Sequence, residues 1–236
     1  EIDGAGYGML AGRELEAGMV IFEEQPFFTR VQPDAIRNRK EWDTAWNKAF
    51  DGISAKLRMP GDPSKTEIPL LASPALVRDA LGFARATPQM KDTISRLSCP
   101  PLTLDHALVQ VSRQVAELCR RRLKECEKLD NETLMTGILA TECNCFPGGR
   151  VFWTMSRVNH SCTPNCVFVS SAGRWGLRAL RDVNPGEELT ISYLGEELLF
   201  PTEKRQLLLW RSKCFVCRCP RCRAEHDQLR QRPCVA

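Results

Sequence analysis

The sequence predicts an α+β fold in which short β-strands lie toward the two ends of the chain and helices lie between them. Three observations support this class. Glycine-punctuated, β-favouring stretches occupy residues 1–30, a long amphipathic helical pattern follows Leu102, and strand-like runs separated by turn residues fill 151–193. With 236 residues, 43% of them hydrophobic, the chain is long enough to bury a core, and its length fits one elaborated domain or a domain with a subdomain.

The first hundred residues divide into two parts. In residues 1–30 the apolar run Met19–Phe22 predicts a strand, and the frequent glycines predict tight turns between strands. Residues 31–100 contain Trp42 and Trp46 at helical spacing and a stretch broken by proline and glycine at 59–63. We expect helical pieces joined by loops there.

The centre of the chain carries the strongest helical pattern. From Leu104 to Leu123 the apolar side chains recur every three to five residues, with the basic residues 120–122 and 124 largely off that stripe, which predicts an amphipathic helix. A short second helix is expected over 134–141. Strands are expected at 151–153, 166–169, 175–180 and 189–193, with a turn at 184–187. Thr202 can then cap a helix that runs to about Arg211.

The charge balance is mild. Thirty-three Lys and Arg residues against 29 Asp and Glu give a formal charge of +4, so we expect no direct nucleic-acid binding. The sequence has neither an apolar run of 18 residues nor a charged leader followed by an apolar stretch. We therefore expect no membrane contact, a location in the nucleus and/or cytoplasm, and a monomer.

Twelve cysteines are many for a chain expected inside the cell, where close cysteine spacing points to metal binding. Cys217, Cys219 and Cys222 are spaced so that three thiolates can surround one tetrahedral Zn²⁺. The spacing does not identify a fourth ligand. The candidates are Cys162, Cys166, Cys214 and His226.

Three motifs occur in a specific order in the last third of the chain. Asn-His-Ser-Cys at 159–162 is followed by Gly-Glu-Glu-Leu-Thr-Ile-Ser-Tyr at 186–193 and by Cys-x-Cys-x-x-Cys at 217–222. This order resembles the C-terminal half of the SET methyltransferase family. The glycine-rich stretches 6–11 and 16–21 look like that family's first motif.

Within that family the chain is most similar to the SMYD branch, through Ile138–Phe146 and through Thr202–Leu209 before the zinc cysteines. It departs from that branch in one respect. SMYD proteins carry a MYND zinc finger after the first strands, but this sequence has no cysteine before Cys99 and no histidine before His106. What that finger contributes in the family is therefore not carried over.

The resemblance implies a β-rich SET fold of short curved sheets with a knot-like crossing, a helical insertion and a C-terminal post-SET zinc segment. It divides the chain into the N-terminal part of the SET domain (1–30), the helical insertion (31–141), the C-terminal part of the SET domain (142–198) and the post-SET helix and zinc segment (199–236). It also implies methyl transfer from S-adenosylmethionine to a lysine side chain of a histone or another protein.

The resemblance also implies site roles. Tyr193 is the expected catalytic residue, which orients the lysine amine and contacts the cofactor; a tyrosine ending a strand otherwise fills a core. Asn159 and His160 are expected to bind the cofactor, chiefly through main-chain groups and the Asn amide, or else to form a capped turn. Gly6, Tyr7 and Gly8 are expected at the cofactor, or else form an ordinary turn, and Asn144 is expected at the cofactor, or else forms a helix C-cap. Phe215 is expected to stack on the adenine, or else to belong to the core. Phe146 and Tyr193 are expected to line the lysine channel.

For the structural zinc, the resemblance selects Cys162 as the fourth ligand beside Cys217, Cys219 and Cys222. The metal would then tie the C-terminal segment to the cofactor-binding turn, so that chelation should remove Phe215 and one wall of the lysine channel. The other cysteines are expected to be small buried or free thiols rather than a second metal site, and His106 and His226 are expected at the surface.

Two other functions fit the same pattern: a SET scaffold that has lost turnover and serves as an interaction module, and an enzyme acting on a small-molecule amine. Tyr193, the Asn-His pair and the four cysteines argue against loss of turnover. Net charge does not separate a protein substrate from a small amine. Detectable methyl transfer would exclude the interaction module.

Overall fold

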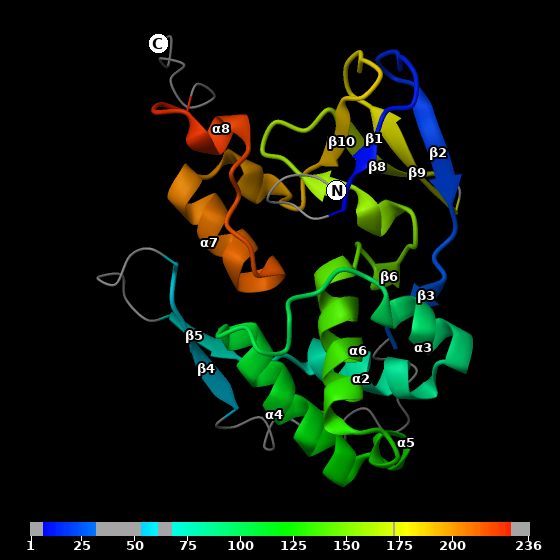
Figure 1. Cartoon of the computed structure of the whole chain (residues 1–236), viewed down its shortest axis with the longest axis vertical. Coiled ribbons are helices and arrows are strands. Elements are labelled where there is room, and N and C mark those ends of the chain that lie inside the picture. The colour runs from blue at the N-terminus through cyan, green and yellow to red at the C-terminus, as the bar shows by residue number, and fades with distance from the viewer. Residues whose placement is uncertain (1–6, 32–52, 61–67, 172, 228–236) are drawn as a thin grey trace. The chain divides into compact units, whose positions relative to one another are not determined.

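The computed structural model describes residues 7–31, 53–60, 68–171 and 173–227 (Figure 1). Its strands are β1 (Met9–Leu10), β2 (Val20–Glu24), β3 (Phe28–Thr29), β4 (Ser54–Leu57), β5 (Ile68–Leu71), β6 (Arg150–Val151), β7 (Asn159–His160), β8 (Cys166–Ser171), β9 (Arg174–Ala179) and β10 (Glu188–Ile191). Its α-helices are α2 (Pro74–Arg85), α3 (Pro88–Ser95), α4 (Ala107–Arg122), α5 (Lys124–Glu127), α6 (Asn131–Asn144), α7 (Thr202–Lys213) and α8 (Pro220–Arg223), with short 3₁₀ helices η2 (Met155–Arg157) and η3 (Glu196–Leu199).

The chain forms two compact units. The first contains residues 1–25, 154–210 and 215–236, and the second contains 26–153 and 211–214. The first unit therefore joins the beginning and the end of the chain, and holds two small sheets with most of α7. The second unit holds α2 to α6 and two pairs of strands. The four-part division of the sequence given above stays a prediction.

The larger sheet of the first unit has the strand order β2-β9-β8, with both pairings antiparallel. Two glycines allow it to form. Gly173 has a φ of +76° in the turn between β8 and β9, a conformation that side chains disfavour. At Gly176 a Cβ atom would lie 2.8 Å from the carbonyl oxygen of Phe22, so β2 and β9 pair this closely only because Gly176 has none.

The smaller sheet of the first unit has the order β1-β10-β7, with β10 antiparallel to β1 and parallel to β7. Leu189 and Ile191 of β10 are buried, as the alternating pattern requires, while Thr190 lies opposite Asn159 and Ile191 opposite His160. The parallel pair places the Asn-His motif beside the strand that leads directly into Tyr193.

In the second unit α6 packs against α2, α3 and α4, and Figure 1 shows it in green among these helices. The approach of α2 and α6 depends on Gly137, because a Cβ there would lie 2.3 Å from the ring of Phe83. Asp130 caps the start of α6 by accepting the backbone N–H of Thr133 at 2.8 Å. The helix is longer than the predicted 134–141 at both ends.

The β4–β5 hairpin is a correction, since the sequence predicted helical pieces joined by loops across 31–100. In β4 the exposed Ser54 and Lys56 alternate with the buried Ala55 and Leu57, and the hairpin packs on α4 (Figure 1). Four alternating residues next to a proline- and glycine-rich break give too weak a pattern to predict a strand. Helices α2 and α3 agree with the prediction, whereas Trp42 and Trp46 lie outside the described residues.

The helix predicted from Leu104 to Leu123 is α4, and its start gives a second correction. His106 was expected at the surface but is only 2% exposed. Its Nδ1 accepts the backbone N–H of Leu108 at 3.0 Å and so caps the helix. His226 is exposed, as predicted. In the described parts of the chain, no helix combines the length and the apolar character needed to cross a membrane.

Candidate functional site

Tyr193 follows β10 and is held by two hydrogen bonds within the first unit. Its backbone N–H donates to His160 Nδ1 at 3.0 Å, and its hydroxyl donates to the carbonyl oxygen of Val158 at 2.8 Å. Both partners come from the turn that carries the Asn-His motif. Because the hydroxyl proton is used in this bond, the phenolic oxygen can act toward any further group only as an acceptor.

Three rings cluster around this point. The centroid of the Tyr193 ring lies 5.3 Å from that of His160 and 6.3 Å from that of Phe215, where the two planes are nearly perpendicular at 85°. His160 and Phe215 are 6.1 Å apart. Tyr193 and Phe215 are only partly buried, so their ring surfaces remain able to contact an aromatic or aliphatic ligand.

Burial of the His160 ring lowers its pKa to about 4, so the imidazole is neutral at pH 7. Since Nδ1 accepts a hydrogen bond from Tyr193, the single ring proton of the neutral form lies on Nε2. That nitrogen is 3.3 Å from Cys162 Sγ. His160 therefore contacts Tyr193 through one nitrogen and a cysteine through the other.

The glycine-rich first motif meets the Asn-His turn. Asn159 Nδ2 donates to Glu188 Oε1 at 2.8 Å and to the carbonyl oxygen of Tyr7 at 3.4 Å. The side chain of Tyr7 is 74% exposed, so its backbone rather than its ring forms the inner surface here. Gly8 is partly buried next to it, and Gly6 lies outside the described residues.

Four cysteines converge in the first unit, as the resemblance implied. The Sγ atoms of Cys162, Cys217, Cys219 and Cys222 all lie within 4.8 Å of one another, with Cys162 Sγ at 4.0 Å from Cys217 and 3.6 Å from Cys222. Zinc bound to four thiolates at about 2.3 Å in a tetrahedron would place the sulfurs about 3.8 Å apart. Hydrogen bonds from Cys162 and Cys217 lower the pKa of Cys222 to about 7, which favours the thiolate that binds metal. The residues therefore fit a zinc ion.

A buried arginine that the motifs did not reveal contacts this four-cysteine cluster. Arg205 of α7 is completely buried and donates from Nε to Cys162 Sγ at 3.3 Å and from Nη2 to Cys222 Sγ at 3.6 Å. It also donates to Asp227 at 2.8 Å, and Arg221 donates to both oxygens of the same carboxylate at 2.8 and 2.9 Å. A buried guanidinium aimed at two sulfurs is satisfied when those sulfurs are anionic.

Asn165, three residues after Cys162, is a second group that sequence reasoning missed. Its side chain is buried and accepts the backbone N–H of Thr190 at 2.8 Å while donating to the carbonyl oxygen of Glu188 at 2.7 Å. It thereby hydrogen-bonds to β10 as a neighbouring strand would. Its position just after the Asn-His-Ser-Cys motif, between Cys162 and Cys166, was the one signal that could have identified it.

Asn144 and Phe146 belong to the second unit. Asn144 is the last residue of α6, and its amide donates to the carbonyl oxygens of Ala140 at 2.8 Å and Ser98 at 2.7 Å. The residue at the C-cap position of α6 is Cys145, one after Asn144. Phe146 packs edge-to-face on Phe152 with centroids 5.3 Å apart. Their cofactor and channel roles stay predictions.

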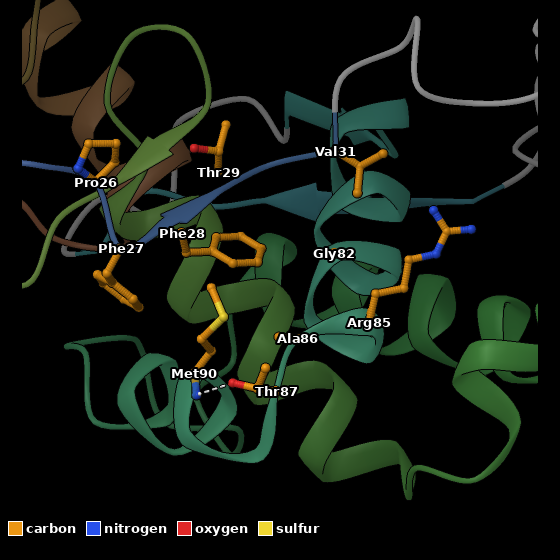
Figure 2. Close-up of a pocket in the computed structure, with 10 residues that line it drawn as sticks. All are labelled: Pro26, Phe27, Phe28, Thr29, Val31, Gly82, Arg85, Ala86, Thr87 and Met90. Carbon is orange, nitrogen blue, oxygen red and sulfur yellow. Dashed lines mark hydrogen bonds between the residues drawn. The ribbon is translucent and has the colours of Figure 1, made fainter. Parts of the chain in front are cut away.

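The second unit also contains an open cavity of about 290 Å³ between β3 and the end of α2 (Figure 2). Figure 2 shows Phe28 and Met90 beside each other, with Gly82 and Arg85 of α2 on the opposite side. No residue predicted for the cofactor, the lysine channel or the metal lines it. The chemistry-bearing residues are therefore concentrated elsewhere.

Comparison with known proteins gives related results. The family model described as the SET domain matches residues 6–194. Histone-lysine N-methyltransferase SMYD3 of Mus musculus is 42% identical over 78 residues, which cover 33% of this chain and 18% of that protein. N-lysine methyltransferase SMYD2 of Bos taurus is 31% identical over 121 residues, which cover 48% of this chain and 28% of that protein. The chain thus spans less than a third of the length of these relatives.

Among solved structures, the SET domain of LSMT bound to lysine and AdoHcy superposes with a TM-score of 0.42 at 12% identity. The match covers 92% of this chain and 52% of that chain, but a score this low supports no inference.

The family match covers most of the chain and includes the glycine-rich first motif, the Asn-His-Ser-Cys motif and the motif that ends at Tyr193, whereas Cys217–Cys222 lie beyond it. The predicted fold class is confirmed: small sheets, a helical insertion and a C-terminal four-cysteine cluster are all present. This chain belongs to the SET-domain methyltransferase family.

Proposed function

We propose that this chain transfers a methyl group from S-adenosylmethionine to the side-chain amine of a lysine. The observation that carries the proposal is the position of Tyr193, whose backbone and hydroxyl are both bound to the Asn-His turn. That arrangement fixes the phenolic oxygen in a partly open aromatic cluster, with its proton engaged so that the oxygen acts as an acceptor. An acceptor fixed in this way can orient an amine or a polarised methyl group.

The chemistry explains why such an acceptor is useful. The sulfonium of S-adenosylmethionine supplies an already activated methyl group, so the protein has to align an unprotonated amine with it. Deprotonating a free lysine of pKa about 10.4 at pH 7 costs roughly 4 to 5 kcal/mol. Apolar surroundings and the nearby positive sulfonium both lower the lysine pKa. We assign Tyr193 the role of orienting the deprotonated nitrogen.

The proposed cofactor contacts come from the residues for which the family resemblance implies them. Asn159 and the main chain of His160, with the backbone of residues 6–8, would hold the amino-acid and sugar portions. The bond from Asn159 to the Tyr7 carbonyl supports this, because it brings the two motifs together. Phe215 would stack on the adenine, and Asn144 and Phe146 are proposed for the cofactor and the lysine channel.

We also propose that the four-cysteine cluster binds one structural Zn²⁺. The sulfur spacing, the thiolate favoured at Cys222 and the buried Arg205 support it. In that role the cluster would fix the segment that carries Phe215 to the turn that carries His160, because Cys162 and Cys217 belong to these two segments.

The proposed substrate is a lysine in a protein, and a histone is the first protein to test. Support comes from the relatives, which are called a histone-lysine and an N-lysine methyltransferase. A nuclear or cytoplasmic location, a monomeric state and the absence of direct nucleic-acid contact stay predictions.

A labelled-methyl assay tests the function. The purified chain is incubated with methyl-labelled S-adenosylmethionine and separate panels of histones, cell-extract proteins and small amines, while calorimetry measures cofactor binding. Label on protein lysine supports the proposal, and label confined to small amines would replace the substrate class. Cofactor binding without transfer to any acceptor would indicate an interaction module, and absence of both binding and label would contradict the proposal.

A further inference from the structure

We propose that the His160 side chain is a positioning residue that couples the four-cysteine cluster to the catalytic tyrosine. The imidazole would transmit the state of the metal cluster to Tyr193 by accepting a hydrogen bond from Tyr193 and donating one to Cys162. The inference deepens the proposed function and rests on it, because it gives the cluster an effect on the reacting site beyond holding Phe215 in place.

The directions of the two hydrogen bonds follow from their partners. The backbone N–H of Tyr193 can only donate, so His160 Nδ1 must be the acceptor at 3.0 Å. The ring proton is then on Nε2, which lies 3.3 Å from Cys162 Sγ. A thiolate sulfur only accepts, so the Nε2–H group donates to it. The bonds run in one direction, from Tyr193 through the ring to Cys162.

The surrounding backbone keeps the ring in this position. His160 is paired with Ile191 in the parallel ladder of β7 and β10, and the backbone N–H of Ser161 donates to the carbonyl oxygen of Ile191 at 2.9 Å. Tyr193 is two residues beyond Ile191, and Cys162 is two residues beyond His160. The ring therefore bridges the two chain segments just past the end of their ladder.

Cys162 receives a second donor, because Arg205 Nε lies 3.3 Å from the same sulfur. Loss or exchange of the metal would change the charge on this sulfur and hence the strength of the His160 bond. The other ring nitrogen would pass that change to the Tyr193 amide. Tyr193 is also bound through its hydroxyl to Val158, so a shift at its amide would rotate the ring about that second attachment.

Three substitutions separate this role from simple filling of space. His160→Asn keeps an acceptor close to the Nδ1 position but loses the donor to Cys162. His160→Gln keeps a donor close to the Nε2 position but loses the acceptor for Tyr193. His160→Leu loses both. If the ring only fills space, the effects of the three substitutions should follow the size of the new side chain. If the ring is a bridge, His160→Asn should affect only the Cys162 bond, His160→Gln only the Tyr193 bond, and His160→Leu both.

The first measurement is metal release, followed as transfer of Zn²⁺ from the whole chain to a colorimetric chelator. Release should be roughly 10 to 100 times faster in His160→Asn and His160→Leu than in the unchanged protein, as for other groups that hydrogen-bond to metal ligands. Release from His160→Gln should stay close to that of the unchanged protein. Equal release rates in all four proteins would overturn the link to the cluster.

The second measurement is the amide resonance of Tyr193 in chain labelled with ¹⁵N-tyrosine, which has only two tyrosines. The resonance should move in His160→Gln and His160→Leu and remain in His160→Asn. Exchange of Zn²⁺ for ¹¹³Cd²⁺ should shift it in the unchanged protein but not in His160→Leu, and the His160 Nε2 proton should show coupling to the cadmium. A Tyr193 resonance that ignores both metal exchange and substitution would overturn the proposal.

Neither measurement requires turnover, so the outcomes remain distinct. A protein that shows the bridge but no methyl transfer would disprove the proposed function and leave the coupling intact. A protein that transfers methyl groups but shows no bridge would disprove the coupling through His160 and leave the proposed function intact. In an active protein His160→Gln should lower kcat more than it raises the KM for S-adenosylmethionine, because the main-chain contacts of residue 160 remain.

Discussion

Tyr193 and Phe215 are the residues whose chemistry depends most on their immediate surroundings. A tyrosine after a strand usually fills a core, but here the ring is partly open and its hydroxyl proton is engaged by the carbonyl oxygen of Val158. The direction of that bond determines the role of the oxygen, because a hydroxyl that has donated its proton can act toward another group only as an acceptor.

Tyr193→Phe should lower kcat on the order of 100-fold, because removal of one positioned polar group commonly costs this much. The ring and its contacts with His160 and Phe215 remain, so the affinity for S-adenosylmethionine and the melting temperature should change little. Single-turnover methyl transfer and calorimetry provide the two measurements. An unchanged rate with normal cofactor binding would contradict the role given to the hydroxyl.

Arg205→Met should destabilise the protein by about 3 to 5 kcal/mol, because two cluster sulfurs lose the donor that Arg205 supplies and the partly buried Asp227 keeps only the bonds from Arg221. Arg205→Lys retains the charge but not the planar set of donors, so it should recover part of that loss. Urea unfolding monitored by tryptophan fluorescence measures both, and a loss below about 1 kcal/mol in the Met variant would refute this account of the buried guanidinium.

Sequence alone predicted the residues that belong to recognisable motifs. Cys162 was chosen as a zinc ligand by resemblance, and the four sulfurs do meet. Arg205, Asp227 and Asn165 were missed, because each has at least one partner more than 20 residues away in the sequence. An arginine in a helix is ordinarily exposed, and no pattern in 202–213 distinguishes Arg205 from its neighbours until α7 packs on the cluster.

At the scale of elements, the position of β10 depends on a side chain as well as on its two strand partners. Asn165→Ala should cost about 2 kcal/mol or more, because the N–H of Thr190 and the carbonyl oxygen of Glu188 lose a buried partner. Asn184→Ala provides the control at an exposed asparagine in the turn before β10, with an expected change within about 0.5 kcal/mol. Equal urea midpoints for the two variants would contradict this role of the Asn165 side chain.

Helices and strands were predicted well where a long segment buries one face. The prediction was poorer where a helix is buried on most of its faces, and where a strand has only four alternating residues. The apolar stripe of α4 gave its position to within a few residues. Helix α6 is buried on most of its faces, so its stripe is weak, and the Asp130 cap sets its start. His106 looked like a surface residue because a histidine at a helix start can face water, but it is buried and its ring caps α4.

For the whole molecule, Glu187 provides a prediction about pH. Its hydrogen bond from Arg181 lowers the pKa of the carboxyl to about 2, below the value of an unfolded glutamate. Such a group contributes stability that is present above about pH 4.5 and is lost as pH falls toward 2. The difference in unfolding free energy between the protein and Glu187→Gln should therefore shrink from pH 6 to pH 2. It should stay below about 1 kcal/mol, because Arg181 is 54% exposed. If this difference in unfolding free energy grows as the pH falls, the pKa of Glu187 is raised in the folded protein, and the prediction is wrong.

The proposed zinc joins parts of the first unit that are 55 residues apart in sequence, since Cys162 and Cys217 belong to one cluster. Metal analysis should therefore return about one zinc per chain, and a value near two would mean that further cysteines bind metal. Chelation should leave the segment around residues 217–223 without its attachment, because the metal–sulfur bonds that join Cys162 to this segment are then lost. Binding of S-adenosylmethionine should weaken with it, because Phe215 belongs to the same segment.

Limited trypsin digestion tests that loss of attachment at the level of the chain. Arg218, Arg221 and Arg223 offer cleavage sites within the segment, and the exposed Arg121 and Arg122 on α4 offer control sites in the second unit. Chelation should speed cleavage at 218–223 by about tenfold or more while the rate at 121–122 stays the same, because opening of the cluster exposes only local backbone. Added Zn²⁺ should restore protection. Equal acceleration at both places would instead mean that the metal stabilises the whole fold, and no acceleration at either would mean that Arg205, Arg221 and Asp227 hold the segment without it.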